Sequence, residues 1–190
     1  GVIPFANLIH KKLNLPTFLT NDANAAAIGE MIFGKAKNEK DFIMITLGTG
    51  VGSGIVANGQ LIYGHDGFAG EIGHTIYDPN GRTCGCGRKG CLETYASAGG
   101  IVKTAIEFLD KNDDISILRD IPRNELSAKN IAEAANLKDK IAIDVYDYTA
   151  KVLGLKLADS IAHTSPSTIY IFGGVANAGD VLMKPLEKYM

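Results

Sequence analysis

The sequence contains no apolar run that approaches the roughly 20 residues of a membrane-spanning helix. Its N-terminus, GVIPFANL, lacks the basic and apolar regions of a signal peptide. The formal net charge is only −2, so the composition gives no sign of a nucleic-acid or anionic-membrane partner. With 46% apolar and 21% charged residues, the chain has the composition of an ordinary globular protein.

Cysteine is scarce, and the three cysteines all fall between residues 84 and 91. Cys84 and Cys86 are separated by a single residue, which is poor geometry for a mutual disulfide, and the odd number leaves one thiol over. These features argue against a secreted disulfide scaffold. They favour a reduced, cytoplasmic protein in which the thiols bind a metal.

Internal repeats and obvious linkers are also missing, so we expect a single lobe that spans residues 1–190. The mixture of strand and helix patterns predicts an α/β fold. The chain opens directly on a strand–helix pair and its last helical pattern runs to the final residues. We therefore expect it to be part of a longer protein.

The clearest strand signal is Phe42–Leu47, the apolar run FIMITL, and Asn58-Gly59 is a strong signal for a two-residue hairpin. Residues 42–63 therefore predict an antiparallel meander. Strands are expected at residues 17–20, 42–47, 51–57, 60–63 and 168–172. Helices are expected at residues 6–13, 23–33, 92–95, 101–109, 128–135, 139–163 and 180–189.

The cysteine loop has the spacing of a zinc site. Cys84, Cys86 and Cys91 supply three thiolates, and the intervening glycines let the backbone fold tightly around a small ion. His74 is the nearest candidate for the fourth ligand, with His65 as an alternative. The loop could also simply carry free cysteines. Four protein ligands would make a structural site, because no position is left open for a catalytic water.

Two carboxylates flank this loop. Glu71 precedes His74 by three residues, so one turn of helix would place both on the same face, and Glu93 follows Cys91 by two residues. Together with a metal-bound histidine they could form a rigid cluster that grips hydroxyl groups. Solvated surface carboxylates beside a purely structural zinc loop are an equally good interpretation.

Two glycine-rich turns are further candidates. LGTGVGSG (residues 47–54) lacks the Gly-Lys-Ser/Thr ending of a P-loop, and the strand pattern after it excludes a dinucleotide fingerprint. Its free amides and the Thr49 hydroxyl could cradle phosphate, or the stretch could be only a tight hairpin. FGGVANAG (residues 172–179) could admit a flat ring close to the backbone, or serve close packing.

Asp22 stands where a strand pattern meets an alanine-rich helix. Asn21 or Asp22 is a natural N-cap for that helix. Open α/β sheets bind ligands at the carboxyl ends of their strands, so Asp22 could instead accept a proton from a substrate hydroxyl.

Together these segments resemble the ROK family of sugar kinases and related repressors. TNDANAAAIGE, LGTGVGSGIV, GFAGEIGH with CGCGRKGCLE, and IFGGVANAG resemble the family's catalytic, phosphate, sugar-and-zinc and adenosine segments. The resemblance implies the larger lobe of an actin-like ATPase (ribonuclease H-like) fold, with a zinc loop at residues 70–93. It implies ATP-dependent phosphorylation of a hexose, most simply glucose, by a cytoplasmic homodimer.

The resemblance also implies roles for individual residues. Asp22 would be the general base, and the zinc would be structural. The sugar would be held by Asn21, Asp22, Gly54, Glu71, His74 and Glu93. The zinc would be held by His74, Cys84, Cys86 and Cys91. ATP, accompanied by Mg²⁺, would be held by Gly48, Thr49, Gly50, Gly52, Gly173 and Gly174.

Two departures from the family pattern stand out. Thr20 occupies a position where the family often has glutamate, and we expect little consequence. No Asp-x-Gly-Gly-Thr phosphate loop occurs in the chain, so we expect these 190 residues alone to be a poor kinase. Kinases for N-acetylhexosamines or fructose, and sugar-sensing repressors, remain alternatives. A repressor would need a helix-turn-helix segment, and the chain offers no basic helix pair.

Overall fold

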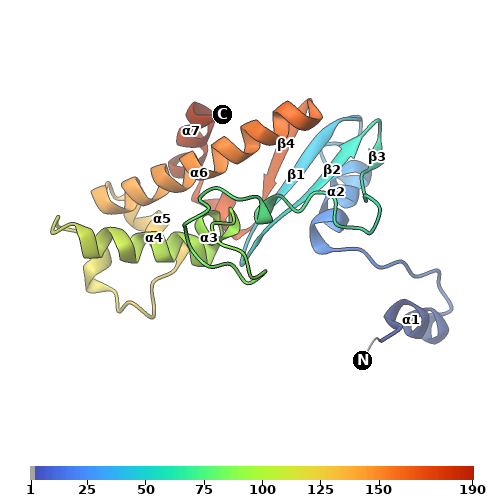
Figure 1. The fold of residues 1–190 in the computed structure, drawn as a ribbon, viewed down its shortest axis with the longest axis horizontal. Helices are drawn as coiled ribbons and strands as arrows, with labels where there is room; N and C mark the ends of the chain where they lie inside the picture. Colours follow the sequence, from blue (N-terminus) through green and yellow to red (C-terminus); the bar gives the residue numbers. More distant parts are fainter. Residues whose placement is uncertain (1–2) are drawn as a thin grey trace.

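A four-stranded mixed sheet forms the centre of the computed structural model, which describes residues 3–190 (Figure 1). The strand order is β3-β2-β1-β4, with β1 antiparallel to β2 and parallel to β4, and β2 antiparallel to β3. The strands are β1 Phe42–Leu47, β2 Val51–Ala57, β3 Gln60–Leu61 and β4 Thr168–Phe172. The predicted meander and the predicted α/β class are both confirmed.

Strand β1 is buried on both faces, as its continuous apolar run predicted. Successive side chains of a strand point to opposite faces. Ile43, Ile45 and Leu47 accordingly join the larger apolar core beneath the C-terminal helices, whereas Phe42 and Met44 join a smaller core with helix α2. The sheet is therefore covered on both sides.

Helix α2 covers one face and the helices after residue 92 cover the other. The longest, α6, packs against α4, α5 and α7. The helices are α1 Phe5–Leu13, α2 Asp22–Phe33, α3 Glu93–Ala96, α4 Ala98–Lys111, α5 Ala128–Asn136, α6 Lys140–Thr164 and α7 Asp180–Tyr189. Short 3₁₀ turns occur at Ile72–His74, Ile117–Asp120 and Gly174–Ala178.

Side-chain caps set the helix starts where the sequence predicted them. Asn21, the first of the two candidate residues, caps α2, because its Oδ1 accepts from the backbone N–H of Asn24 at 2.7 Å. Ser127 caps α5 in a reciprocal arrangement with Asn130. The start of α2 is thus determined locally, at the residue that precedes Asp22.

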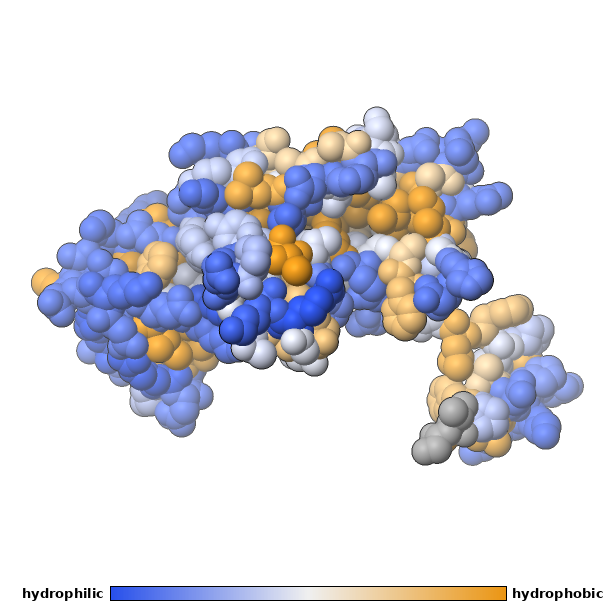
Figure 2. All heavy atoms as spheres, viewed as in Figure 1, coloured by the Kyte–Doolittle hydropathy of each residue, from blue (hydrophilic) through white to orange (hydrophobic). Residues whose placement is uncertain are grey.

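The strand predicted at residues 17–20 is wrong. This stretch is extended but has no partner strand within residues 3–190, and Phe18 is 89% exposed. Helix α1 buries none of its residues and stands apart from the body, with apolar side chains along this whole segment open to solvent (Figures 1 and 2). An apolar pattern makes a strand only where another strand supplies hydrogen bonds. The strand predicted at 60–63 is also shorter, ending at Leu61.

Within residues 3–190, no helix combines the length and the apolar character that crossing a membrane requires.

Candidate active site

A cavity of about 450 Å³ opens at the carboxyl ends of the parallel strands β1 and β4. This edge is where open α/β sheets place their ligands. The walls come from the start of α2, the turn between β1 and β2, and the loop that carries the cysteines. The polar or glycine residues that line it are Asn21, Asp22, Thr46, Gly48, Thr49, Gly50, Gly52, Ser53, Glu71, His74, Glu93 and Gly173.

Asp22 stands at the wall of this cavity as the first residue of α2. Its Oδ1 accepts from the adjacent N–H of Ala23 at 2.9 Å, and Asn21 caps the helix from the preceding position. A carboxylate at a helix N-terminus is favoured by the exposed amides and the helix dipole. The second carboxylate oxygen of Asp22 has no protein partner among the described residues, so it is free to accept a proton from a ligand.

Two glycines of β2 allow α2 to lie directly on the sheet. A Cβ at Gly52 would lie 3.0 Å from the Cβ of Ala23, and one at Gly54 would lie 2.6 Å from the Cβ of Ala27. Larger side chains would push α2, and Asp22 with it, away from the cavity. Gly52 lines the cavity but Gly54 does not, so the contact of Gly54 is with the helix.

A short 3₁₀ turn, Ile72–His74, presents Glu71 and His74 to the same cavity. The turn is fastened to β2 by Ser53, whose hydroxyl donates to the carbonyl of Gly70. Gly70 has φ +86°, and a Cβ there would lie 2.9 Å from the carbonyl oxygen of Ser53. This position therefore requires glycine, for its conformation and for the close approach.

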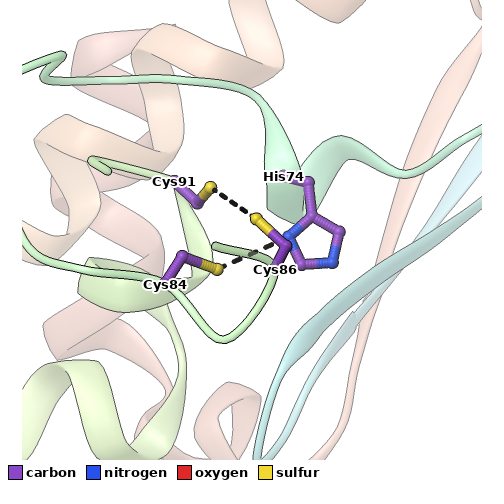
Figure 3. Close-up of side chains that lie close together, drawn as sticks. All are labelled: His74, Cys84, Cys86 and Cys91. Carbon is purple, nitrogen blue, oxygen red and sulfur yellow. Dashed lines mark hydrogen bonds between the residues drawn. The ribbon is translucent and has the colours of Figure 1, made fainter. Parts of the chain in front are cut away.

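His74 and the three cysteines form a compact cluster in which the four ligand atoms all lie within 4.8 Å of one another. The Sγ atoms of Cys86 and Cys91 are 3.6 Å apart, and Sγ of Cys84 is 3.7 Å from Nδ1 of His74 (Figure 3). A tetrahedral ion with bonds of about 2.3 Å has ligands about 3.8 Å apart, so the spacing fits a four-coordinate metal. The alternative ligand His65 lies outside this cluster.

The local environment shifts the pKa values of the three thiols in different directions. Burial raises the pKa of Cys84 to about 12 and also raises the pKa of Cys91. Hydrogen bonds from the backbone and side chain of Arg88 lower the pKa of Cys86 to about 6. Arg88 also donates to the carbonyl of His74 at 2.9 Å, so it ties the loop together across the cluster. Two buried thiols need a cation nearby before they become thiolates, which suits a metal site.

His74 faces two ways. Its Nδ1 points at the sulfurs, and Figure 3 shows the second ring nitrogen pointing away from them. Glu93 bridges in a similar manner: its Oε1 is 3.2 Å from Sγ of Cys84, while a Cβ at Gly50 would lie 3.0 Å from its Oε2. The metal cluster, the glycine turn and the cavity are therefore in direct contact through these two side chains.

The Gly48–Gly50 turn also borders a second cavity, of about 600 Å³, and Gly48 and Thr49 line both. The turn is held by Ala98 at the start of α4, whose N–H donates to the carbonyl of Gly48 at 2.9 Å. The second cavity lies between α5 and the 3₁₀ turn after β4, and Gly174 lines it. One turn rich in backbone amides thus separates two cavities of the size that small ligands occupy, roughly 300–1,000 Å³.

Gly173 is required where β4 ends. Its φ is +111°, and a Cβ would lie 2.3 Å from the carbonyl oxygen of Leu47. The backbone of β4 can therefore pass close to β1 only with glycine here. Gly174 has open space around its Cα, toward the second cavity.

Most residues predicted from the sequence meet in one place, from segments up to about 150 positions apart. Sequence reasoning missed Thr46, Ser53 and Phe172, which also line the first cavity. Ser53 had a detectable signal, because a polar residue at an inward position of a strand is unusual, and it is only 3% exposed. The other two gave no such signal.

Residues 2–190 match the model of the ROK family. This chain belongs to the ROK family. The chain is 42% identical over 188 residues to a glucokinase of Halalkalibacterium halodurans, and the match covers 98% of the chain and 57% of that protein. The fold expected from the resemblance is confirmed, since the structure matches those of ROK sugar kinases, members of the actin-like ATPase family.

Two solved ROK structures are similar throughout the chain. A ROK glucokinase from Streptomyces griseus, in complex with glucose and AMPPNP, has a TM-score of 0.87 and 36% identity, covering 98% of this chain and 61% of that one. A ROK transcriptional regulator, a homologue of the E. coli MLC protein, has a TM-score of 0.87 and 34% identity, covering 97% and 46%. The chain thus spans about three fifths of the length of the glucokinases that it matches.

Proposed function

We propose that the whole protein to which this chain belongs transfers the γ-phosphoryl group of ATP to a hexose hydroxyl, most simply converting glucose to glucose 6-phosphate. One observation carries the proposal. Asp22, Glu71, His74 and Glu93 converge in a single cavity, which a glycine turn separates from a second cavity. The similarity to glucokinases, one of them solved with glucose and AMPPNP, supports it.

In this proposal the sugar occupies the first cavity. The carboxylates of Glu71 and Glu93 accept hydrogen bonds from hydroxyl groups, and the outward nitrogen of His74 makes a further one. Asn21 adds a side-chain amide at the edge. Because these groups come from segments that the cysteine cluster and β2 hold in place, they can orient one hydroxyl toward Asp22. Such orientation supplies much of the acceleration in phosphoryl transfer. Gly54 would act indirectly, through its contact with α2.

Asp22 then accepts the proton of that hydroxyl. The hydroxyl oxygen of the sugar attacks the γ-phosphorus, and the bond from phosphorus to the oxygen of ADP breaks. Asp22 lines the same cavity as the glutamates, and its second carboxylate oxygen has no protein partner among the described residues, which suits this role. Mg²⁺ bound with ATP would offset the charge of the phosphates.

ATP would lie across the glycine turn. Thr49 would offer its hydroxyl to the phosphates, and the turn Gly48–Gly50 with Gly52 would let them approach the backbone closely. The N–H of Gly48 already donates to the carbonyl of Gly50 at 3.0 Å, so Gly48 would shape the turn. The second cavity would hold the adenosine beside Gly174, and Gly173, which lines the first cavity, would contact it from the end of β4. The sharing of Gly48 and Thr49 by both cavities supports this placement, because the γ-phosphate must reach the first cavity from the second.

The metal would be zinc, since three thiolates and one imidazole at tetrahedral spacing are a common zinc set. With four protein ligands the site is structural. It would hold His74 and the loop before Glu93 still while Asp22 takes part in the reaction. Thiolate ligands persist in a reducing compartment, which supports a cytoplasmic location.

A sugar-sensing repressor is the second candidate, favoured by the similarity to a ROK transcriptional regulator at 34% identity. Such a protein needs the residues that bind the sugar but does not need a general base. The presence of Asp22 at the cavity wall, with one carboxylate oxygen that has no partner among the described residues, therefore favours the kinase. Kinases for N-acetylhexosamines or fructose would use the same arrangement with another sugar.

The deciding experiment is a coupled ADP-release assay on the whole protein with a panel of hexoses and N-acetylhexosamines. We expect turnover with glucose, and we expect Asp22→Asn to lower kcat by roughly two orders of magnitude or more, because the base is lost while the sugar grip remains. Calorimetry should show nearly unchanged glucose affinity for that variant. Absence of turnover with every sugar, together with specific DNA binding, would support the repressor instead.

A further inference from the structure

Glu93 is the first residue of α3, a helix too short to be stable by itself. Helix α3, Glu93–Ala96, has only four residues, and a helix of one turn has little stability of its own. Yet Glu93 must keep its carboxylate between Cys84 and Gly50. Core packing of Tyr95 and Ala96 holds the inner side of α3, and polar contacts can fix its position relative to the cysteine loop.

The side chain of Arg82 makes the contacts that this task requires. Its Nη1 donates to the carbonyls of Thr94 at 2.7 Å and Gly100 at 3.0 Å. Its Nη2 donates to Oγ1 of Thr104 at 2.9 Å, and its Nε donates to Oε1 of Glu107 at 3.0 Å. The side chain is only 12% exposed. One guanidinium thus joins α3 to both the first and the third turn of α4.

The backbone of Arg82 belongs to the cysteine loop. Arg82 precedes Cys84 by two residues, and its carbonyl accepts from the N–H of Gly90 at 2.7 Å, across the base of the loop. Its own N–H donates to the hydroxyl of Tyr95 in α3 at 3.1 Å, and its guanidinium carbon lies 4.6 Å from the centre of that ring. Arg82 therefore connects the loop to α3 through both main chain and side chain.

Lysine could not replace these contacts. The planar guanidinium offers five donors in a rigid fork, and here four acceptors and an aromatic ring surround it. An ammonium group on a flexible stem would reach one or two of them. The buried carbonyl of Thr94 would then lose its charged donor, and α3 would be free to shift.

We propose that Arg82 is a positioning residue for the sugar site: it holds α3 so that the Glu93 carboxylate meets the substrate hydroxyls in the correct place. This inference rests on the proposed function. Arg82 does not line the sugar cavity and is outside the metal cluster, so it acts through Glu93.

The test is a double-mutant cycle in the whole protein, with Arg82→Lys, Glu93→Gln and the combination. We expect Arg82→Lys to raise the KM for glucose roughly tenfold, the effect of losing about one hydrogen bond to a charged group, while kcat and the KM for ATP change less than about twofold. In the Glu93→Gln background the same substitution should have little further effect, because both act on one contact. Arg123→Lys is the matched control, since Arg123 pairs with Asp110 on the exposed surface.

The outcomes separate this inference from the proposed function. If the unchanged protein neither binds nor phosphorylates any sugar, the proposed function fails first. If it phosphorylates glucose and Arg82→Lys behaves like Arg123→Lys, or if its effect adds fully to that of Glu93→Gln, the inference is wrong. Zinc content must stay at about one per chain, because a KM that rises only in proportion to zinc loss would also overturn it. If Arg82→Lys does not fold, Glu107→Ala, which removes the acceptor of the Arg82 Nε, replaces it, and an unchanged KM for glucose would then overturn the inference.

Discussion

Alanine substitutions at two glycines of the cysteine loop should have very different consequences. Gly87 and Gly90 both have positive φ, at +87° and +71°. A Cβ at Gly87 would meet no atom within 4 Å, whereas one at Gly90 would lie 1.6 Å from the carbonyl oxygen of Asp78. The two positions therefore share the backbone strain and differ in the steric clash.

The expected magnitudes follow from these contacts. A left-handed conformation costs an alanine about 1–2 kcal/mol, which the lower entropy of the unfolded chain reduces by about 0.4–1 kcal/mol. Gly87→Ala should therefore cost about 1 kcal/mol. Gly90→Ala must also move the loop away from Asp78, weakening the hydrogen bonds of Gly90 with Tyr77 at 2.8 Å and Arg82 at 2.7 Å. At about 1 kcal/mol each, these raise the cost to about 3 kcal/mol.

Urea unfolding of the zinc-loaded whole protein, followed by circular dichroism, measures the difference, and metal analysis after dialysis against a weak chelator measures zinc retention. We expect Gly87→Ala to keep its zinc and Gly90→Ala to lose much of it, because Gly90 adjoins Cys91. Unfolding free energies that agree within about 0.5 kcal/mol for the two variants would refute the steric argument.

Three further predictions concern the turn, the metal and the far end of the sheet. Gly50→Ala should raise the KM for the sugar, because its Cβ would press on the Glu93 carboxylate, whereas Gly48→Ala, with no atom within 4 Å, should have little effect in the same assay. Cys86→Ser should weaken zinc binding on the order of tenfold or more and raise the sugar KM in parallel; metal-free protein with unchanged sugar affinity would contradict the scaffold role. The hydrogen bond to Glu39 raises the pKa of Tyr170 to about 12. This hydrogen bond therefore stabilises the folded state fully below the unfolded pKa near 10, and that contribution is lost as the pH rises toward 12. Tyr170→Phe should make the unfolding free energy depend less steeply on pH between about pH 10 and 12. An unchanged slope would count against the hydrogen bond between Tyr170 and Glu39.

Local chemistry made several elements predictable. The apolar run FIMITL has the length of one buried strand, and Asn58-Gly59 suits a two-residue hairpin. The β1–β2–β3 meander could therefore be derived from neighbouring residues alone. The spacing Cys-x-Cys-x₄-Cys predicted a metal loop for the same reason, since ligands so close in sequence can surround one ion without help from the rest of the fold.

Residues 17–20 show where such reasoning fails. Their apolar, β-branched pattern is that of a strand, but a strand is completed by hydrogen bonds to a neighbour, and none pairs with them in the part of the chain that the structure describes. Arg82 is the opposite case. A single arginine in a loop reads as a solvated charge, and only the packing of α3 and α4 around it shows that four acceptors converge on its guanidinium.

The sequence by itself indicated the cysteine loop Gly70–Glu93, the strands β1, β2 and β4, and a cap for α2 at Asn21 or Asp22, because each depends on residues within one or two turns of chain. Only the tertiary structure decided that Asp22 shares a cavity with Glu71, His74 and Glu93, and that the Gly48–Gly50 turn divides it from a second cavity. The physical reason is that β4, more than 120 residues after β1, pairs parallel to it and brings their carboxyl ends together. No local pattern specifies that pairing; β4 supplies backbone hydrogen bonds to the edge of β1 that β2 leaves open.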